Sequence, residues 1–269
     1  MHILFTKANW ERSDLSVRDF VQLCAETGYD GTEIYLPARP ESTAEIRELH
    51  EAAGLKIVSH IATEGVAPGE HLRSLEERYL RAVELNPLFV NCHTGKDHFS
   101  FTDSLRIFET GERLAAEHGV PLLHETHRGR ALFSAPAALD YLRALPSLRL
   151  TADFSHWVCV HESDLSDQPE ALAAAEACWA RYEQHRNPDS AAAQRTWQHL
   201  GAPWFAAEAA GKAMPLESYD GDPPREASSS WGARNTVCLS RAADAATTWT
   251  NHPRAMAAMR AALLAWALA

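Results

Sequence analysis

The sequence predicts an α/β protein built as a single (β/α)8 TIM barrel. Short β-branched apolar runs alternate with longer stretches whose apolar residues recur every three to four positions, as in amphipathic helices. The polar residues that close successive runs are spaced by roughly 30 residues, and eight such units need about the 269 residues present. An open doubly wound sheet is the alternative, but no glycine-rich phosphate loop follows a run, which disfavours dinucleotide binding.

Six runs are predicted to be buried parallel strands, because such strands are apolar on both sides. They are residues 2–6, 32–36, 56–61, 88–92, 120–125 and 148–154. Between them, amphipathic spacing predicts helices over residues 16–27, 42–53, 71–85, 103–117 and 135–145. Left-handed helix ends are expected at Gly28, Gly54 and Gly119, and helix N-caps at Thr102-Asp103 and Ser134.

The last third of the chain departs from this pattern. Residues 161–269 contain no isoleucine and one valine, whereas residues 1–160 contain six isoleucines and nine valines. Buried parallel strands draw on these residues, so strands seven and eight are expected to be poorly formed or irregular. The best candidates are Trp179–His185 and Ala213–Glu217, before a final helix over Met256–Ala267. We predict one domain over residues 1–269, regular to residue 176 and atypical over 177–269.

Composition and charge disfavour several classes of function. No stretch of about 18 uncharged apolar residues is present, so no membrane span is expected. The net charge is −11 and no basic cluster stands out, which disfavours a nucleic-acid partner. Five cysteines without a CxxC pair, and a start that resembles a strand rather than a secretory signal, predict a cytoplasmic location. A small-molecule substrate suits these features, and a homodimer stays open.

Ionisable residues gather where the runs end, at the barrel edge that carries active sites. The richest segments are Asn91–Gly95, His124–Arg128 and Asp153–Trp157. Imidazole together with carboxylate suits a borderline divalent ion such as Zn²⁺, Mn²⁺ or Co²⁺. We expect Glu125 and Asp153 to share a metal or catalytic site, with His156 three residues after the aspartate. His60 and His93 end earlier runs and are further candidates, with a loop-capping role as their alternative.

Three more residues are candidates for binding substrate. Glu33 closes the second run, and it could instead pair with a nearby cation such as Lys7. His127 and Arg128 follow Glu125 and could bind an anionic group of the substrate, or could cap the next helix.

Four segments carry more specific motifs. They are Gly28-Tyr29-Asp30-Gly31-Thr32-Glu33-Ile34, Val58-Ser59-His60, His124-Glu125-Thr126-His127-Arg128-Gly129-Arg130 and Thr151-Ala152-Asp153-Phe154-Ser155-His156-Trp157. In these segments the chain resembles the sugar phosphate isomerase/epimerase family, of the xylose isomerase-like TIM barrel superfamily. The resemblance covers residues 1 to about 176. It implies a metal-dependent enzyme that moves a proton on a sugar or sugar phosphate through an enediolate, with Mn²⁺, Co²⁺, Mg²⁺ or Zn²⁺ as cofactor.

The resemblance also implies a ligand set from strands five to eight: a glutamate, an aspartate, a histidine and a second glutamate. Glu125 and Asp153 match the first two, and His156 matches the histidine that accompanies the aspartate in contact with substrate or metal. His60 and His93 stand where the related endonuclease branch has zinc ligands. Glu125 would then be a metal ligand and a base.

Strands seven and eight depart from the family pattern. Family members carry His-x-His-Ala-Arg on strand seven, and the nearest match here is Cys178-Trp179-Ala180-Arg181, with His185 close by. Glu217 resembles the strand-eight glutamate loosely and would face Glu125 as a second catalytic acid or base. Either the last third has diverged, or part of the segment after about residue 176 is read out of frame. Sequencing the gene distinguishes the two.

Three functions therefore stay open. The first is a sugar or sugar phosphate isomerase or epimerase. The second is a zinc-dependent phosphodiesterase resembling the apurinic endonucleases. His60 and His93 favour this function, and the net charge of −11 disfavours it. The third is a catalytically impaired barrel that acts as a binding protein.

Overall fold

The computed structural model describes most of the first two-thirds of the chain and three short segments beyond it. The described residues are 3–36, 41–163, 165, 168–171, 173–174, 182–187, 235–239 and 246–247. Nine strands are described: β1 (Ile3–Ala8), β2 (Gly31–Tyr35), β3 (Lys56–Ala62), β4 (Val90–His93), β5 (Leu122–Glu125), β6 (Leu150–Ala152), β7 (Tyr182–Asn187), β8 (Asn235–Leu239) and β9 (Ala246–Thr247). The helices described are a short 3-10 helix (Asn9–Arg12), α1 (Val17–Glu26), α2 (Thr43–Ala53), α3 (Pro68–Val83), α4 (Phe101–His118), α5 (Ala135–Ala144) and α6 (Phe154–His161).

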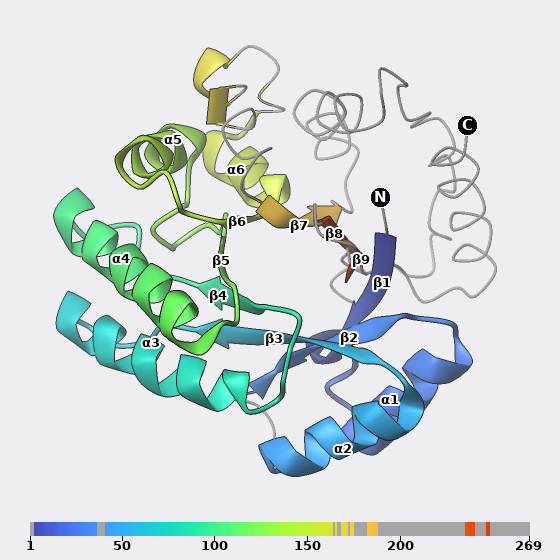
Figure 1. Cartoon of the computed structure of the whole chain (residues 1–269). Helices are drawn as coiled ribbons and strands as arrows, with labels where there is room; N and C mark the ends of the chain where they lie inside the picture. Colours follow the sequence, from blue (N-terminus) through green and yellow to red (C-terminus); the bar gives the residue numbers. More distant parts are fainter. Residues whose placement is uncertain are drawn as a thin grey trace.

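Strands β1 to β6 form a curved parallel sheet with helices on its outer side (Figure 1). Each strand pairs with the next one along the chain, for example Tyr35 with His60 and His60 with Asn91. Strand order equals chain order, so every βα unit adds one strand in the same direction and all carboxyl ends meet at one edge. The predicted βα barrel is confirmed, and each of the six predicted strands has a counterpart.

Three short segments complete the ring of strands. β7 pairs parallel with β6 and lies near the position expected for strand seven, whereas β8 pairs antiparallel with β7 and with β1. β9 pairs parallel with β1. The end of the barrel is thus irregular, as predicted, because an antiparallel pair stands beside β1 where a regular barrel has a parallel strand. The predicted strand Ala213–Glu217 and the predicted helix Met256–Ala267 lie outside the described residues.

Serine side chains start four of the helices. The capping hydroxyls, which accept a hydrogen bond from the backbone three residues on, are those of Ser16, Ser42, Ser100 and Ser134. The cap of α4 corrects the prediction of Thr102-Asp103. Ser100 Oγ accepts from Asp103 N at 3.1 Å and donates to the Asp103 carboxylate at 2.6 Å, so the helix begins two residues earlier. Gly54 and Gly119 end α2 and α4 with φ of 68° and 73°, as predicted.

Strand six is shorter than predicted, because the chain turns into α6 directly after it. β6 ends at Ala152, and Asp153 N donates to Thr126 Oγ1 at 2.6 Å. The carbonyl of Asp153 accepts from His156 N at 3.4 Å in the first turn of α6. This turn brings the side chains of Asp153 and His156 to the same place at the strand end.

Three adjacent βα units carry apolar side chains inside the barrel, below its carboxyl-end rim. Val58, Phe89 and Leu123 form a small buried cluster there, on three adjacent units. Val58 and Leu123 each precede a predicted site residue by two positions, and side chains two apart on a strand share a face. The polar side chains at the rim therefore stand on a packed apolar floor.

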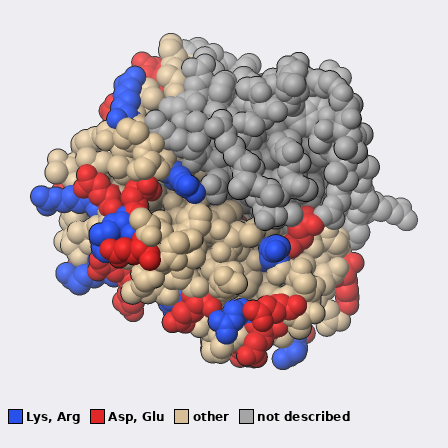
Figure 2. Space-filling model, viewed as in Figure 1, with Lys and Arg blue, Asp and Glu red and all other residues tan. Residues whose placement is uncertain are grey.

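The outer surface of the described helices mixes charges of both signs (Figure 2). Arg113 on α4, for example, donates to Glu117 on the same helix and to Glu76 on α3. Among the helices that the structure describes, none is long and apolar enough to cross a membrane.

Candidate metal centre

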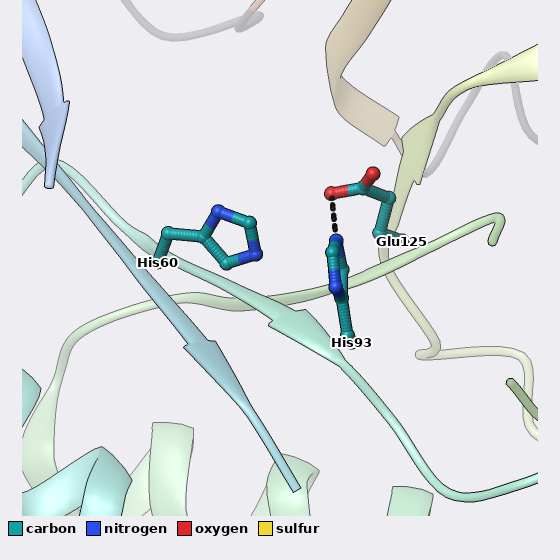
Figure 3. Close-up of side chains that lie close together, drawn as sticks. All are labelled: His60, His93 and Glu125. Atoms are coloured by element: carbon teal, nitrogen blue, oxygen red, sulfur yellow. Dashed lines mark ion pairs between the residues drawn. The ribbon is translucent and has the colours of Figure 1, made fainter. Parts of the chain in front are cut away.

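Side chains from three successive strands converge at the carboxyl-end rim of the barrel. His60 comes from β3, His93 ends β4 and Glu125 ends β5, so one residue of each strand reaches the same place (Figure 3). His93 Nε2 lies 3.0 Å from Glu125 Oε2, and the rings of His60 and His93 are 4.4 Å apart. One nitrogen or oxygen of each residue lies within 4.8 Å of the other two, which is close enough for a shared metal ion.

A second group of donors shares Glu125 with the first. His127 lies in the loop after β5 and His156 in the first turn of α6, and one donor atom of each lies within 4.8 Å of a Glu125 oxygen. The ring of His127 is 4.2 Å from that of His93 and 3.8 Å from that of His156. The four imidazoles thus form a continuous arc around one carboxylate.

Two polar residues lie behind this arc, on the buried side. Glu33 is fully buried on β2, and its Oε1 lies 3.1 Å from His60 Nδ1. Asn91 is fully buried on β4, and its Nδ2 donates to Glu33 Oε1 at 3.2 Å and to Glu125 Oε2 at 2.6 Å. Outer carboxylates and amides of this kind fix the orientation of metal-binding histidines and carboxylates.

Burial shifts two histidines of the arc, His93 and His127, toward the neutral form. The crowded, desolvated site holds the pKa of His93 well below its ordinary value, although Glu125 acts in the opposite direction. Burial likewise lowers the pKa of His127 to about 4, against the pull of Glu125 and with the help of His156. A neutral imidazole is the form that binds a metal ion, so both rings are ready to act as ligands near neutral pH.

The donors present fit the divalent ion that the sequence predicts. Imidazole nitrogen and carboxylate oxygen are the ligands that zinc and similar borderline ions take in proteins. His60 is 4% exposed, and its Nε2 has no hydrogen-bond partner in the part of the chain that the structure describes. A buried polar atom of this kind needs a partner, and a metal ion shared with His93 and Glu125 would supply one.

The other predicted site residues are placed as follows. Asp153 lies beside the arc, with Oδ2 3.7 Å from His156 Nε2. Glu33 lies behind His60, where it is placed to orient that ring. Arg128 is exposed to solvent at the rim. Glu217, the predicted second acid or base, lies outside the described residues.

Sequence reasoning missed Asn91 and Arg130 as parts of the site. Asn91 precedes His93 by two residues, so strand alternation alone would have placed it on the same inner face. Arg130 donates to the carbonyl oxygens of Thr63 and Gly95, and so ties the loop after β5 to the loops after β3 and β4. Arg130 is the last residue of the His124–Arg130 motif, and this position could have indicated that it belongs to the site.

The fold has matches among families and solved structures. Residues 21–199 match the family model of the xylose isomerase-like TIM barrel. None of the curated proteins matches the sequence.

Three similar crystal structures illustrate the range of activities on this fold. A probable 3-DHS dehydratase, AsbF, from Bacillus anthracis has a TM-score of 0.54 at 18% identity, covering 78% of this chain and 80% of that one. A D-allulose 3-epimerase from Methylomonas sp. has a TM-score of 0.53 at 17% identity, covering 65% and 70%. The 3-keto-D-glucoside 4-epimerase YcjR from E. coli has a TM-score of 0.51 at 16% identity, covering 68% and 78%.

These structural likenesses establish the fold, and the family model spans more than half of the 269 residues. The parallel βα units and the family match agree with each other and with the resemblance read from the motifs. The chain belongs to the xylose isomerase-like TIM barrel family.

Proposed function

We propose that this protein is a divalent-metal-dependent isomerase or epimerase that acts on a sugar or sugar phosphate. The observation that carries the proposal is the group of His60, His93 and Glu125 at the active-site end of the barrel, in which His60 and Glu125 are buried and His93 is partly buried. The two epimerases among the similar structures, and a dehydratase with them, make a proton-transfer reaction on a hydroxylated substrate the first candidate.

The residues divide the work between holding a cation and moving a proton. His60, His93 and Glu125 would hold the ion, with Asp153 and His156 completing the set from the turn after β6 and the start of α6. A bound divalent ion would act as a Lewis acid on a carbonyl or hydroxyl oxygen of the substrate. Glu125 lies beside that position and would remove the proton from the adjacent carbon, giving an enediolate.

The remaining residues of the rim would orient the substrate. His127 is packed between His93 and His156, so its ring would contact a substrate oxygen from a fixed position. His156 would orient a second oxygen. The exposed guanidinium of Arg128 would accept an anionic group such as a phosphate. Return of the proton to the opposite face needs a second acid or base, and Glu217 is the residue we propose for it.

A zinc-dependent phosphodiesterase is the second candidate, because the arc offers four imidazoles and zinc favours nitrogen ligands. The net charge of −11 disfavours a nucleic-acid substrate, because binding a phosphate backbone requires cationic side chains. Lys and Arg are interspersed with Asp and Glu on the described part of the face in Figure 2. A binding barrel without turnover is the third candidate.

Solvent-exchange measurements separate these candidates. The purified chain, loaded in turn with Mn²⁺, Co²⁺, Mg²⁺ and Zn²⁺, is incubated in deuterated water with a panel of ketoses and their phosphates. We expect deuterium to enter the carbon next to the carbonyl, to stop after chelation and to resume when metal is returned. Cleavage of a phosphodiester substrate without exchange would establish the second candidate. Metal binding with neither reaction would leave the binding protein.

A further inference from the structure

Asn91 lies at the centre of the polar groups inside the barrel. It is fully buried on the inner face of β4, and its single amide nitrogen donates to carboxylates on both neighbouring sides. Glu33 Oε1 on β2 lies at 3.2 Å and Glu125 Oε2 on β5 at 2.6 Å. An amide NH₂ group has two hydrogens, so each carboxylate can receive one.

Each of these carboxylates also contacts one histidine of the donor group. Glu33 Oε1 lies 3.1 Å from His60 Nδ1, and Glu125 Oε2 lies 3.0 Å from His93 Nε2. The contacts therefore run without a break from His60 through Glu33, Asn91 and Glu125 to His93. This row of contacts spans four adjacent strands, β2 to β5, and the amide of Asn91 joins the two carboxylates.

The two carboxylates need such a link because both are buried. Like charges close together in a region of low dielectric repel each other strongly. A neutral donor placed between them attracts both without adding charge, and it fixes the rotation of each carboxylate group. Fixing Glu33 fixes the ring of His60, while fixing Glu125 fixes a donor atom of the metal group itself.

Packing alone does not account for an asparagine at this position. The floor of the barrel directly below it is apolar, with Val58, Phe89 and Leu123. The amide oxygen of Asn91 is buried without a hydrogen-bond partner in the described part of the chain. A buried acceptor without a hydrogen bond costs folding free energy, so an apolar side chain would fill this space better. We therefore attribute the role of Asn91 to its amide nitrogen.

We propose that Asn91 is the positioning residue of the metal centre: its amide bridges Glu33 and Glu125 and thereby sets the geometry of His60 and Glu125 toward a divalent ion. This inference rests on the proposed function, since it presupposes that the group binds a cation.

Three substitutions separate the donor of Asn91 from its bulk. Asn91→Leu fills the space without a donor, Asn91→Ser keeps a hydroxyl donor in a smaller side chain, and Asn91→Ala keeps neither. The affinity of each metal-free protein for Zn²⁺ and for Mn²⁺ is measured by isothermal titration calorimetry. We expect Asn91→Leu and Asn91→Ala to lose at least about tenfold in affinity, and Asn91→Ser to recover part of that loss.

Thr94→Val is the matched control on the same strand end. Thr94 is also buried, but its hydroxyl lies 2.6 Å from Nδ1 of His124, on the outward-facing side of the sheet. Thermal unfolding of the metal-free proteins identifies variants that are folded. Thr94→Val is expected to lower the unfolding temperature and to leave the affinity unchanged.

The outcomes distinguish the inference from the function on which it rests. Metal binding by the parent, with equal affinity in Asn91→Leu or with no advantage of Asn91→Ser over Asn91→Ala, overturns the positioning role and leaves the proposed function standing. A parent chain that binds neither ion overturns both. If Asn91→Leu does not fold, the comparison of Ser with Ala decides, because these two differ by one oxygen atom.

Discussion

Two sets of histidines, each fully or partly buried, occupy the same βα units and have different surroundings. The outer set lies between the strands and the helices, with His50 on α2, His71 on α3 and His124 on β5, and each member lies against the hydroxyl of a threonine. The pairs are Thr32 with His50 at 2.7 Å, Thr63 with His71 at 2.7 Å and Thr94 with His124 at 2.6 Å. The inner set, His60, His93, His127 and His156, lies against carboxylates and against one another.

The difference is in which ring nitrogens are occupied. Both nitrogens of His50 have partners, Thr32 Oγ1 and the carbonyl of Ile46, at 2.7 Å each. Both nitrogens of His71 are occupied as well, by Thr63 Oγ1 and the carbonyl of Gly65. The rings of His50 and His71 therefore have no nitrogen left for a ligand, whereas Nε2 of His124 has no hydrogen-bond partner in the described part of the chain. On the strands themselves, side-chain alternation separates His124, which faces outward, from His60 and His93, which face inward.

Two consecutive residues of β5, His124 and Glu125, face opposite sides of the sheet. His124 points outward against Thr94, and burial lowers its pKa to about 3, so it stays neutral. Glu125 points inward, where it meets Asn91 and His93. Neighbouring side chains on a strand face opposite ways, so adjacent residues of similar chemistry have unrelated roles.

The largest effect is expected from Glu125→Gln on the inner face. The amide keeps the shape of the side chain but can no longer act as a base or as a charged ligand, so proton exchange should fall by about 10²-fold to 10⁴-fold. Thermal unfolding should change little in the metal-free protein. Glu109→Gln, on the exposed face of α4, is the matched control and should keep full activity. Exchange at the parent rate in Glu125→Gln would remove this residue from the reaction.

Substitution of one histidine from each set should give opposite results. His60→Gln is expected to lower the affinity for Zn²⁺ on the order of a hundredfold, with a small effect on the stability of the metal-free chain. His50→Gln should cost about 1–2 kcal/mol of folding free energy through its two lost hydrogen bonds, and should keep the metal affinity. Calorimetry with Zn²⁺ and urea unfolding measure the two quantities. Loss of metal affinity in both variants would contradict the division.

A smaller loss of stability is expected where α4 crosses close to β5 on the outer side. A Cβ at Gly111 would lie 2.8 Å from Leu122 Cδ2 and 3.1 Å from the His124 ring. Overpacking there costs more than the helix gains from alanine, so Gly111→Ala should lose about 1 kcal/mol. Gly69→Ala in α3 is the control, because only the end of Arg73 lies within 4 Å, and it should be neutral or stabilising. Equal stability of the two variants by urea unfolding would refute the close packing.

The pH dependence of stability should show the weakest of these effects. Burial lowers the pKa of His50 below the ordinary 6.5, so the unfolded chain binds a proton at that residue more tightly than the folded chain. The contribution of His50 is fully present above pH 6.5 and is lost as the pH falls below it. The free energy of unfolding, measured with urea between pH 7.5 and 5.5, should therefore fall less steeply with decreasing pH in His50→Gln than in the parent. The two slopes should differ by less than about 1.4 kcal/mol per pH unit. Parallel curves would contradict the assignment.

The regular part of the fold follows from local patterns. Strands such as β3 and helices such as α2 carry clear periodicity, and Ser42 and Gly54 mark both ends of that helix. The start of α4 was predicted two residues late, because Ser100 and Asp103 cap reciprocally and the prediction used Asp103 as the first signal. The final strands could not be derived, since the last third contains one valine and no isoleucine and β8 pairs antiparallel with β7.

The candidate site was predictable in outline and not in its connections. His60, His93 and Glu125 lie at or near the carboxyl ends of three neighbouring strands of one parallel sheet, so their convergence follows from topology. The link through Asn91 depends on the stagger between β4 and its neighbours, which the sequence does not encode in any local motif. The sequence also did not reveal the surroundings of Glu33, which is fully buried and lies against the ring of His60. Its predicted contact with substrate stays a prediction.

Anomalous diffraction from crystals grown with Zn²⁺ is the most direct test of whether a divalent ion binds between His60, His93 and Glu125. A peak at the zinc edge is expected at about 2.0–2.2 Å from nitrogens of His60 and His93 and an oxygen of Glu125. Zinc bound elsewhere on the molecule, with no peak among these three residues, would contradict the account.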